Sequence, residues 1–372
     1  MRRILFVITC FCLFQNISFA RSTITLMYLH GSNASSQENK QWFENGVNRL
    51  HPVLKKEIEK RVKGKKINPD ISDYVINEQP SLFFWSYNSK AAMESMENRL
   101  NMTKSISAPG AFWARKKLSS ELHDAVWVVK SRHFLPILEQ LNQQIIQEHN
   151  KGNKIILSGY SIGTFVTYKY LLFKLRYLDA EQIFEDLKID NEEISDFIKE
   201  HPQENTCLSA IIDGNIGNIN LDGKFSLNKN KDELKQSYIN LKQLSDKHCA
   251  PEDAVLGVIN YGNPLAIFNS EFEDGDDEFV IYNKRLSYNI LSDGLFFITV
   301  NFVEDPLGFP LISNKATLLK YSDNNSCSNS KGLIYDNYSV KSWRWFIVAH
   351  ESYFSARKIF SKEIAKSFNV KR

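Results

Sequence analysis

The residue in this chain with the clearest capacity for chemistry is a serine that lies between two glycines. Ser161 lies at the centre of the pentapeptide GYSIG (residues 159–163), directly after the apolar run 155–157 and directly before an apolar-periodic segment. This order predicts a strand, a sharp turn and a helix, the context that exposes a nucleophilic serine. A Cβ at either glycine would collide with the strand or helix packed against the turn. We therefore predict that Ser161 is a nucleophile.

A serine hydroxyl becomes a nucleophile when a histidine takes its proton and a carboxylate orients that histidine. We expect these partners after Ser161, in the chain order serine, acid, histidine. Three of the eight histidines follow it, and two of them, His201 and His248, lie inside a long polar segment. His350 alone follows a carboxylate at the end of a predicted strand, so we predict that His350 is the base.

The acid is expected on a loop just beyond the carboxyl end of a core strand. Residues 295–303 form the apolar run LFFITVNFV, and Glu304 and Asp305 follow it directly. Asp305 fits this position best, with Glu304 and Asp293 as the rival carboxylates. The predicted chemistry is acyl transfer, which needs no cofactor, and no spacing of Cys and His resembles a metal site.

Such a site also needs N–H donors for the negative charge that develops on the substrate oxygen. The apolar run 23–29 leads directly into His30, Gly31 and Ser32. We predict the backbone N–H groups of Ser32 and Ile162 as the two donors of an oxyanion hole. For the His-Gly turn taken alone, a plain connection between strand and loop is an equal interpretation.

The elements that must position these residues alternate along the chain. Besides the run before Ser161, the sequence predicts strands at 23–29, 81–87, 255–261 and 295–303, and helices at 41–63, 124–150, 165–178 and 353–368. Strands that alternate with helices predict an α/β fold with a mostly parallel central sheet and helices on both faces.

Two segments interrupt this pattern within the single domain predicted for residues 21–372. Residues 179–252 are acidic and then rich in Asn and Lys, and we predict a helical and irregular insertion that caps the site or covers one edge of the fold. Residues 88–122 are polar with scattered Met and aromatic residues. Their composition favours surface helices and loop over a mobile lid.

The first 20 residues, MRRILFVITCFCLFQNISFA, combine a basic start, an apolar core and small residues at the end. This pattern predicts a signal peptide that is cleaved after Ala20, and hence a periplasmic or secreted protein. The mature chain would keep Cys207, Cys249 and Cys327. In an oxidising compartment the first two would be linked within the insertion and the third left free.

The overall composition excludes several function classes. The 372 residues are 43% hydrophobic and 24% charged, which is typical of a globular protein. The net charge of +3 falls to +1 when Arg2 and Arg3 leave with the signal peptide. So small a charge argues against a nucleic-acid-binding surface, and the oligomeric state is left open.

At the residues described above, the sequence resembles the α/β-hydrolase superfamily and, within it, the class-three, fungal-type lipases. Residues 261–264 (YGNP) stand where that family has Phe-Gly-x-Pro after the elbow. Residues 301–310 (NFVEDPLGFP) look like its Asn-x-x-Asp-x-Val-Pro-x-Leu-Pro pattern, shifted by one residue. His350 precedes the aromatic pair at 353–354, as the family's histidine does. Thr164, where the family often has a glycine, and the long insertion depart from it.

The resemblance implies an α/β-hydrolase fold and a triad of Ser161, Asp305 and His350. We therefore predict an exported serine ester hydrolase that acts on an acyl ester of a lipid, with transient contact with a membrane or lipid surface. An acyltransferase or a thioesterase would use the same triad, and the sequence does not separate them. A non-catalytic interaction protein on a hydrolase scaffold is the third alternative, which the intact candidate triad disfavours.

Overall fold

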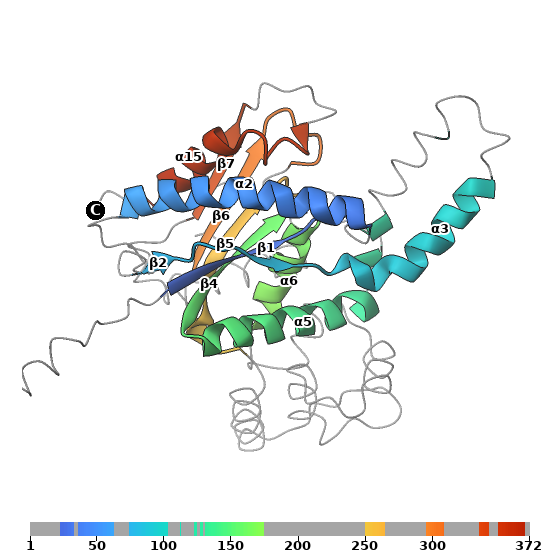
Figure 1. The fold of residues 1–372 in the computed structure, drawn as a ribbon, viewed down its shortest axis with the longest axis horizontal. Coiled ribbons are helices and arrows are strands. Elements are labelled where there is room, and N and C mark those ends of the chain that lie inside the picture. The colour runs from blue at the N-terminus through green and yellow to red at the C-terminus, as the bar shows by residue number, and fades with distance from the viewer. Residues whose placement is uncertain are drawn as a thin grey trace, which may run out of the picture.

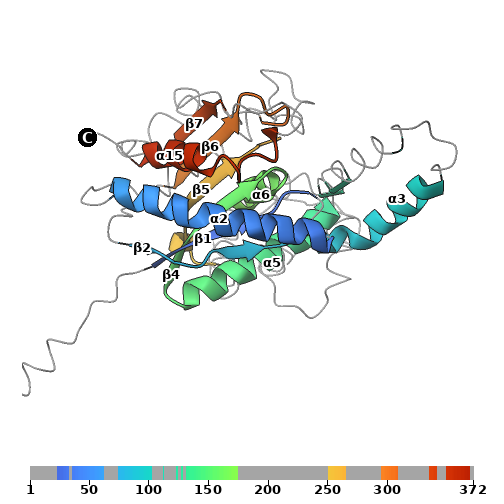
Figure 2. The same cartoon turned by 45° about the horizontal axis from the view of Figure 1, so that its top comes forward.

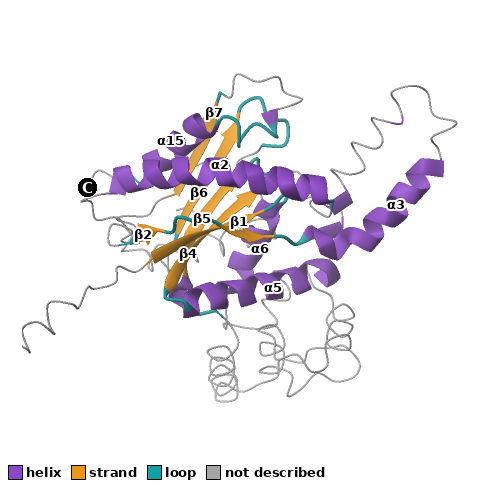
Figure 3. Ribbon diagram, in the orientation of Figure 1, coloured by secondary structure: helices purple, strands orange, loops and turns teal. Residues whose placement is uncertain are grey.

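The computed structural model describes residues 23–32, 36–62, 74–102, 112, 123–124, 127–128, 131–174, 250–264, 295–308, 335–341 and 349–368. These residues form a curled parallel β-sheet with helices on both faces, as Figure 3 shows. The prediction of an α/β fold with a mostly parallel sheet is confirmed. The predicted signal peptide, the disulfide and nearly all of the insertion lie outside the described residues, as does Asp293.

The long strands β1, β4, β5 and β6 coincide with apolar runs of the sequence. Its strands are β1 (Thr23–Leu29), β2 (Val75–Ile76), β3 (Ser81–Phe83), β4 (Asn153–Tyr160), β5 (Val255–Tyr261), β6 (Phe296–Phe302) and β7 (Tyr335–Val340). Their order is β2-β1-β4-β5-β6-β7. Strand β3 is off this path and pairs with residues 27–29 of β1, whereas β2 pairs with residues 23–24. All of these pairs are parallel, so the carboxyl ends of the strands meet at one edge. The central strands are buried on both faces, which is why they are almost continuously apolar.

Helices cover both faces of this sheet (Figure 1). The described helices are α2 (Gln37–Val62), α3 (Lys90–Met102), α5 (Ser131–Asn150), α6 (Gly163–Lys174) and α15 (Arg357–Ser367), with short 3-10 turns η2 (Ser86–Ser89) and η4 (Glu252–Ala254). Helices α2 and α15 pack against each other on one face, and α5 and α6 pack on β4 from the other (Figure 2). Among the described helices, none combines the length and the apolar character that a bilayer crossing requires.

Among the predicted elements that are longer than the observed ones, two have a clear local cause. The strand predicted at 81–87 ends at Phe83, because the N–H groups of Trp85 and Ser86 turn away to bond the imidazole of His30. The helix predicted at 353–368 begins only at Arg357. The serine hydroxyls at 352 and 355 bond backbone carbonyl oxygens three residues earlier, which favours turns over helix there. Strands β2 and β7 were not predicted at all.

The polar segment predicted at 88–122 is described only in part. Its described portion contains α3, on which Met93 is buried and Met102 is 79% exposed. Figure 1 shows α3 pointing away from the sheet. Residues 90–102 therefore form a largely exposed helix.

Candidate active site

The turn at Ser161 has the backbone conformation that a nucleophile elbow requires. Ser161 lies between β4 and α6 with a φ of 53°, in the left-handed region that non-glycine residues rarely adopt. Its N–H donates to the carbonyl oxygen of Tyr261 at 3.0 Å, and the N–H of Thr164 donates to the Ser161 carbonyl oxygen at 2.9 Å. The surrounding strand and helix therefore hold the strained residue in place.

The two glycines of the pentapeptide are needed for close packing, as predicted. A Cβ on Gly159 would lie 2.6 Å from Oδ1 of Asn260, and one on Gly163 would lie 2.6 Å from the carbonyl oxygen of His30. Both distances are too short for real carbon atoms. The elbow can therefore approach β1 and β5 only because these residues have no side chain.

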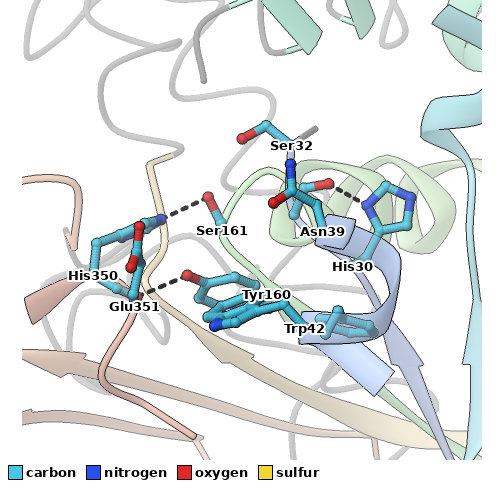
Figure 4. Close-up of a pocket in the computed structure, with 10 residues that line it drawn as sticks. His30, Ser32, Asn39, Trp42, Tyr160, Ser161, His350 and Glu351 are labelled. Atoms are coloured by element: carbon cyan, nitrogen blue, oxygen red, sulfur yellow. Dashed lines mark hydrogen bonds between the residues drawn. The ribbon is translucent and has the colours of Figure 1, made fainter. Parts of the chain in front are cut away.

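The structure brings the three predicted triad side chains together. Nε2 of His350 lies 2.8 Å from Oγ of Ser161, the contact drawn in Figure 4. Nδ1 of His350 lies 2.9 and 3.0 Å from the two carboxylate oxygens of Asp305. An ionised carboxylate only accepts hydrogen bonds, so Nδ1 carries the proton and Nε2 is left as an acceptor for the serine hydroxyl.

The Asp305 carboxylate is fully buried, and protein groups donate several hydrogen bonds to it. It accepts the Leu307 N–H at 2.9 Å and the Tyr353 hydroxyl at 2.8 Å, in addition to the imidazole. Burial by itself raises the pKa of this carboxyl, but the bonds from His350, Leu307 and Tyr353 outweigh that effect and bring the pKa below its ordinary value. Asp305 is therefore ionised at neutral pH, and it is Asp305, rather than Glu304, that contacts the imidazole.

Two neighbouring strands hold His350 in place. The Tyr160 hydroxyl, at the end of β4, donates to the His350 carbonyl oxygen at 2.8 Å, and the two rings stack with centroids 5.4 Å apart. Gly262, after β5, has a φ of +60°, and a Cβ there would lie 3.1 Å from Cε1 of His350. The sequence analysis did not assign these roles, because Tyr160 and His350 are 190 residues apart in the chain.

Thr164 stands where the class-three lipases often have a glycine, and it bonds the backbone of the Ser161 turn. Its hydroxyl donates to the Ser161 carbonyl oxygen at 2.6 Å and lies 2.9 Å from Oδ1 of Asn263. The N–H of Asn263 in turn donates to Oδ1 of Asn301 at 3.1 Å. The side chains of Thr164, Asn263 and Asn301 are therefore buried close together at the elbow and the ends of β5 and β6. A glycine at position 164 would lack the hydroxyl that bonds the Ser161 carbonyl oxygen.

The predicted oxyanion turn lies beside Ser161. A Cβ on Gly31 would lie 2.9 Å from the Cβ of Ser161, and Figure 4 shows Ser32 close to the serine side chain. Ile162 directly follows Ser161 and is buried. In the described parts of the chain, no backbone carbonyl takes up the N–H of Ser32 or of Ile162. Both residues predicted as donors therefore flank Ser161, and neither N–H is taken up by a described backbone carbonyl.

His30, one residue before Gly31, is completely buried within this turn. Its Nε2 accepts the backbone N–H groups of Trp85 at 2.8 Å and Ser86 at 3.0 Å. Its Nδ1 therefore carries the proton and donates to the Gly31 carbonyl oxygen. Burial lowers the pKa of His30 to about 3, against the opposing effect of the bond to Gly31, so the ring is neutral.

A cavity of about 170 Å³ opens above the serine. Trp42 and Phe43 of α2 and Tyr160 of β4 form an aromatic wall, while Asn39 and Glu351 are polar parts of the lining. The side chains of Ser161, His350, His30 and Ser32 complete it, as Figure 4 shows. Within the described ranges, no group of three or more His, Cys, Asp or Glu residues is arranged to hold a metal.

Comparisons with known proteins do not identify a family. No protein-family model, no curated protein and no solved structure matches the chain. Arguments about function therefore depend on the geometry of the site itself.

Proposed function

We propose that this chain is an exported serine ester hydrolase with an α/β-hydrolase fold, similar to the class-three lipases, and that it acts on an acyl ester of a lipid. The observation that carries the proposal is the continuous contact from Ser161 Oγ through the His350 imidazole to the Asp305 carboxylate. These side chains come from three separate turns at the same edge of the sheet. The strained backbone of Ser161 supports the proposal independently, because such strain tends to be kept where function requires it.

The geometry supports a two-step reaction through an acyl-enzyme. In the first step Oγ of Ser161 forms a bond to the ester carbonyl carbon while its proton moves to Nε2 of His350. Asp305 stabilises the resulting imidazolium through Nδ1, and the N–H groups of Ser32 and Ile162 bond the oxyanion. The tetrahedral intermediate then collapses, the carbon–oxygen bond to the alcohol breaks, and the alcohol leaves with the proton from Nε2.

The second step repeats this chemistry with water. His350 takes a proton from a water molecule, whose oxygen bonds the acyl carbon, and Ser161 leaves with the proton that Nε2 returns. The products are the free acid and the unmodified serine. An acyltransferase would use another alcohol in place of water, and a thioesterase would release a thiol in the first step.

The lipid part of the proposal is supported by the aromatic wall of Trp42, Phe43 and Tyr160. The described walls enclose less volume than the roughly 300–1,000 Å³ that is usual for pockets that surround a whole small ligand. They fit the reacting ester and the first part of its acyl chain. Export is supported by the basic and apolar pattern of residues 1–20, and N-terminal sequencing of the mature protein tests it.

A fluorophosphonate probe, together with a panel of short and long acyl esters, tests the proposal. The wild-type protein should be labelled and should hydrolyse esters, whereas Ser161→Ala should do neither and should keep a thermal midpoint near that of wild type. Ser158→Ala is the matched control, because Ser158 is buried on β4, the strand that leads into the Ser161 turn, and its hydroxyl is not the one that contacts His350. Substantial turnover by pure Ser161→Ala would refute the assignment of the nucleophile.

A further inference from the structure

The peptide bond between Gly31 and Ser32 lies beside Ser161. The residue on its N-terminal side, residue 31, has to be glycine. A Cβ on Gly31 would come within 2.9 Å of the Cβ of Ser161 and within 3.3 Å of the Tyr160 ring. Glycine is thus required for space, but glycine also lets the following peptide rotate at little cost. Something other than the local backbone must therefore fix the direction in which the Ser32 N–H points.

The imidazole of His30 is placed to do this. Its Nδ1–H donates to the carbonyl oxygen of that same peptide, the Gly31 carbonyl. The ring cannot turn over, because Nε2 holds the N–H groups of Trp85 and Ser86 on its other side. It is also packed flat against the indole of Trp85, with ring centroids 4.9 Å apart and an interplanar angle of 14°.

The backbone around the ring is fixed as well. The indole N–H of Trp85 donates to the His30 carbonyl oxygen at 3.1 Å, and the His30 N–H approaches the Phe83 carbonyl oxygen at 3.4 Å. A Cβ on Gly163 would lie only 2.6 Å from the same His30 carbonyl oxygen, so this oxygen packs closely against Gly163. The histidine is therefore clamped between the β3 edge and the first turn of α6.

In a trans peptide the C=O and N–H bonds point in opposite directions. A carbonyl oxygen that is held toward His30 therefore directs the Ser32 N–H away from His30, to the side on which Ser161 lies in Figure 4. We propose that His30 is a positioning residue, which orients the Gly31–Ser32 peptide so that the Ser32 N–H faces the oxyanion of the reaction. With the peptide reversed, the site would present a carbonyl oxygen to that negative charge and would repel it.

This inference rests on the proposed hydrolase function, and it differs from the role of the triad in a measurable way. His30 touches no reacting atom and should not affect the binding of the ground-state ester. Its loss should reduce stabilisation of the transition state alone, which lowers kcat while KM is preserved.

The test compares His30→Gln and His30→Ala with the wild-type enzyme in ester hydrolysis. We expect kcat to fall about 10²–10³-fold, the loss associated with one oxyanion-hole donor, while KM changes little. A medium-chain alkyl trifluoromethyl ketone, which forms an oxyanionic adduct with the serine, should lose affinity by a similar factor. A role in structure alone would not make the two losses parallel.

His51→Gln is the matched control. His51 is also a buried histidine whose ring bonds a backbone carbonyl, that of Asn77 at 2.8 Å, and it contacts Tyr28 instead of the active site. This variant should lose stability but keep kcat and ketone affinity. If a folded His30 variant keeps kcat and ketone affinity within a factor of about three, the inference is overturned, because a lost donor costs far more. Failure of the wild-type protein to react with a fluorophosphonate would instead overturn the proposed function, and this inference with it.

The wild-type protein decides the matter if neither His30 variant folds. Nitrogen-15 NMR of the labelled histidines should show His30 protonated on Nδ1, and the Ser32 amide proton should shift downfield when the trifluoromethyl ketone binds. A His30 protonated on Nε2, or a Ser32 amide that does not respond to the ketone, would overturn the inference.

Discussion

Two histidines line the same cavity from opposite sides of Ser161, and their surroundings are different. His30, at the end of β1, is 1% exposed, and both of its ring nitrogens bond the backbone. The His350 side chain is 17% exposed, and its nitrogens contact the side chains of Ser161 and Asp305. The first histidine is held by groups that cannot move, and the second lies between two groups that take part in the proposed chemistry.

The difference shows how partners decide the role of a histidine. Protonation of His30 at Nε2 would place a new N–H against two backbone N–H donors, so the ring stays neutral. Protonation of His350 at Nε2 leaves its bond to Asp305 intact and strengthens it, because the carboxylate is negative. The same residue type is thus a rigid support on one side of the serine and, in the proposed reaction, a proton acceptor on the other.

The largest predicted effect separates the two histidines by activity. His350→Gln should lower kcat by about 10⁶-fold, the scale at which loss of one triad member disables the whole unit. It should change the thermal midpoint little, since the side chain is partly exposed and its contacts serve the reaction. His30→Gln should instead lower the free energy of unfolding by about 2–4 kcal/mol, because two buried N–H groups lose their acceptor. Steady-state kinetics and thermal unfolding of both variants check this, and equal losses of activity would erase the distinction.

The next effect tests the source of the charge behind His350. Asp305→Asn should lower kcat by about 10⁴-fold, because an amide favours the wrong tautomer of the imidazole. Glu304→Gln is the control and should change kcat little, since the described contacts pair the imidazole with Asp305. Kinetics of the two purified variants compare them directly. If Glu304→Gln proves to be the damaging change, the acid has been assigned to the wrong carboxylate.

The neutral state of His30 predicts how stability depends on pH. Its pKa is about 3 in the folded chain, below the value of about 6.5 for an unfolded histidine. Between these values the unfolded chain binds a proton that the folded chain does not, so stability falls as the pH falls through 6.5. From pH 7 to pH 4.5 the wild-type protein should lose about 2–3 kcal/mol more than His30→Gln does. Urea unfolding at the two pH values measures this. An identical pH dependence would mean that His30 is not held neutral by its surroundings.

The smallest effect concerns the support of Asp305. The Tyr353 hydroxyl accepts the Phe302 N–H at 2.9 Å, so its own proton goes to Asp305. Tyr353→Phe removes one bond to a charged group, which is worth about 1.5–3 kcal/mol, and should lower kcat about tenfold or somewhat more. Tyr261→Phe is the control, because that ring packs 5.5 Å from Tyr353 but its hydroxyl is not among the described donors to Asp305. Equal kcat values for the two variants would remove Tyr353 from the site.

The sequence by itself determined the local features of this protein. The apolar runs at 23–29 and 255–261 coincide with β1 and β5, because buried parallel strands are apolar along their whole length. The two glycines around Ser161 mark a turn that has no room for side chains. The chain order, with His201 and His248 inside a polar segment, left His350 as the one histidine to consider, and the structure does place His350 against Ser161.

Only the tertiary structure decided which groups touch. Glu304 and Asp305 are neighbours in the sequence, and the turn after β6, in which the Asp305 N–H bonds the Phe302 carbonyl oxygen, directs Asp305 to the histidine. The role of His30 depends on Trp85 and Ser86, more than 50 residues further along the chain. Periodicity and spacing record what each residue needs from its immediate neighbours along the chain. The partners of His30 and Asp305 are brought to them by the packing of the sheet and its helices, and no local pattern specifies that packing.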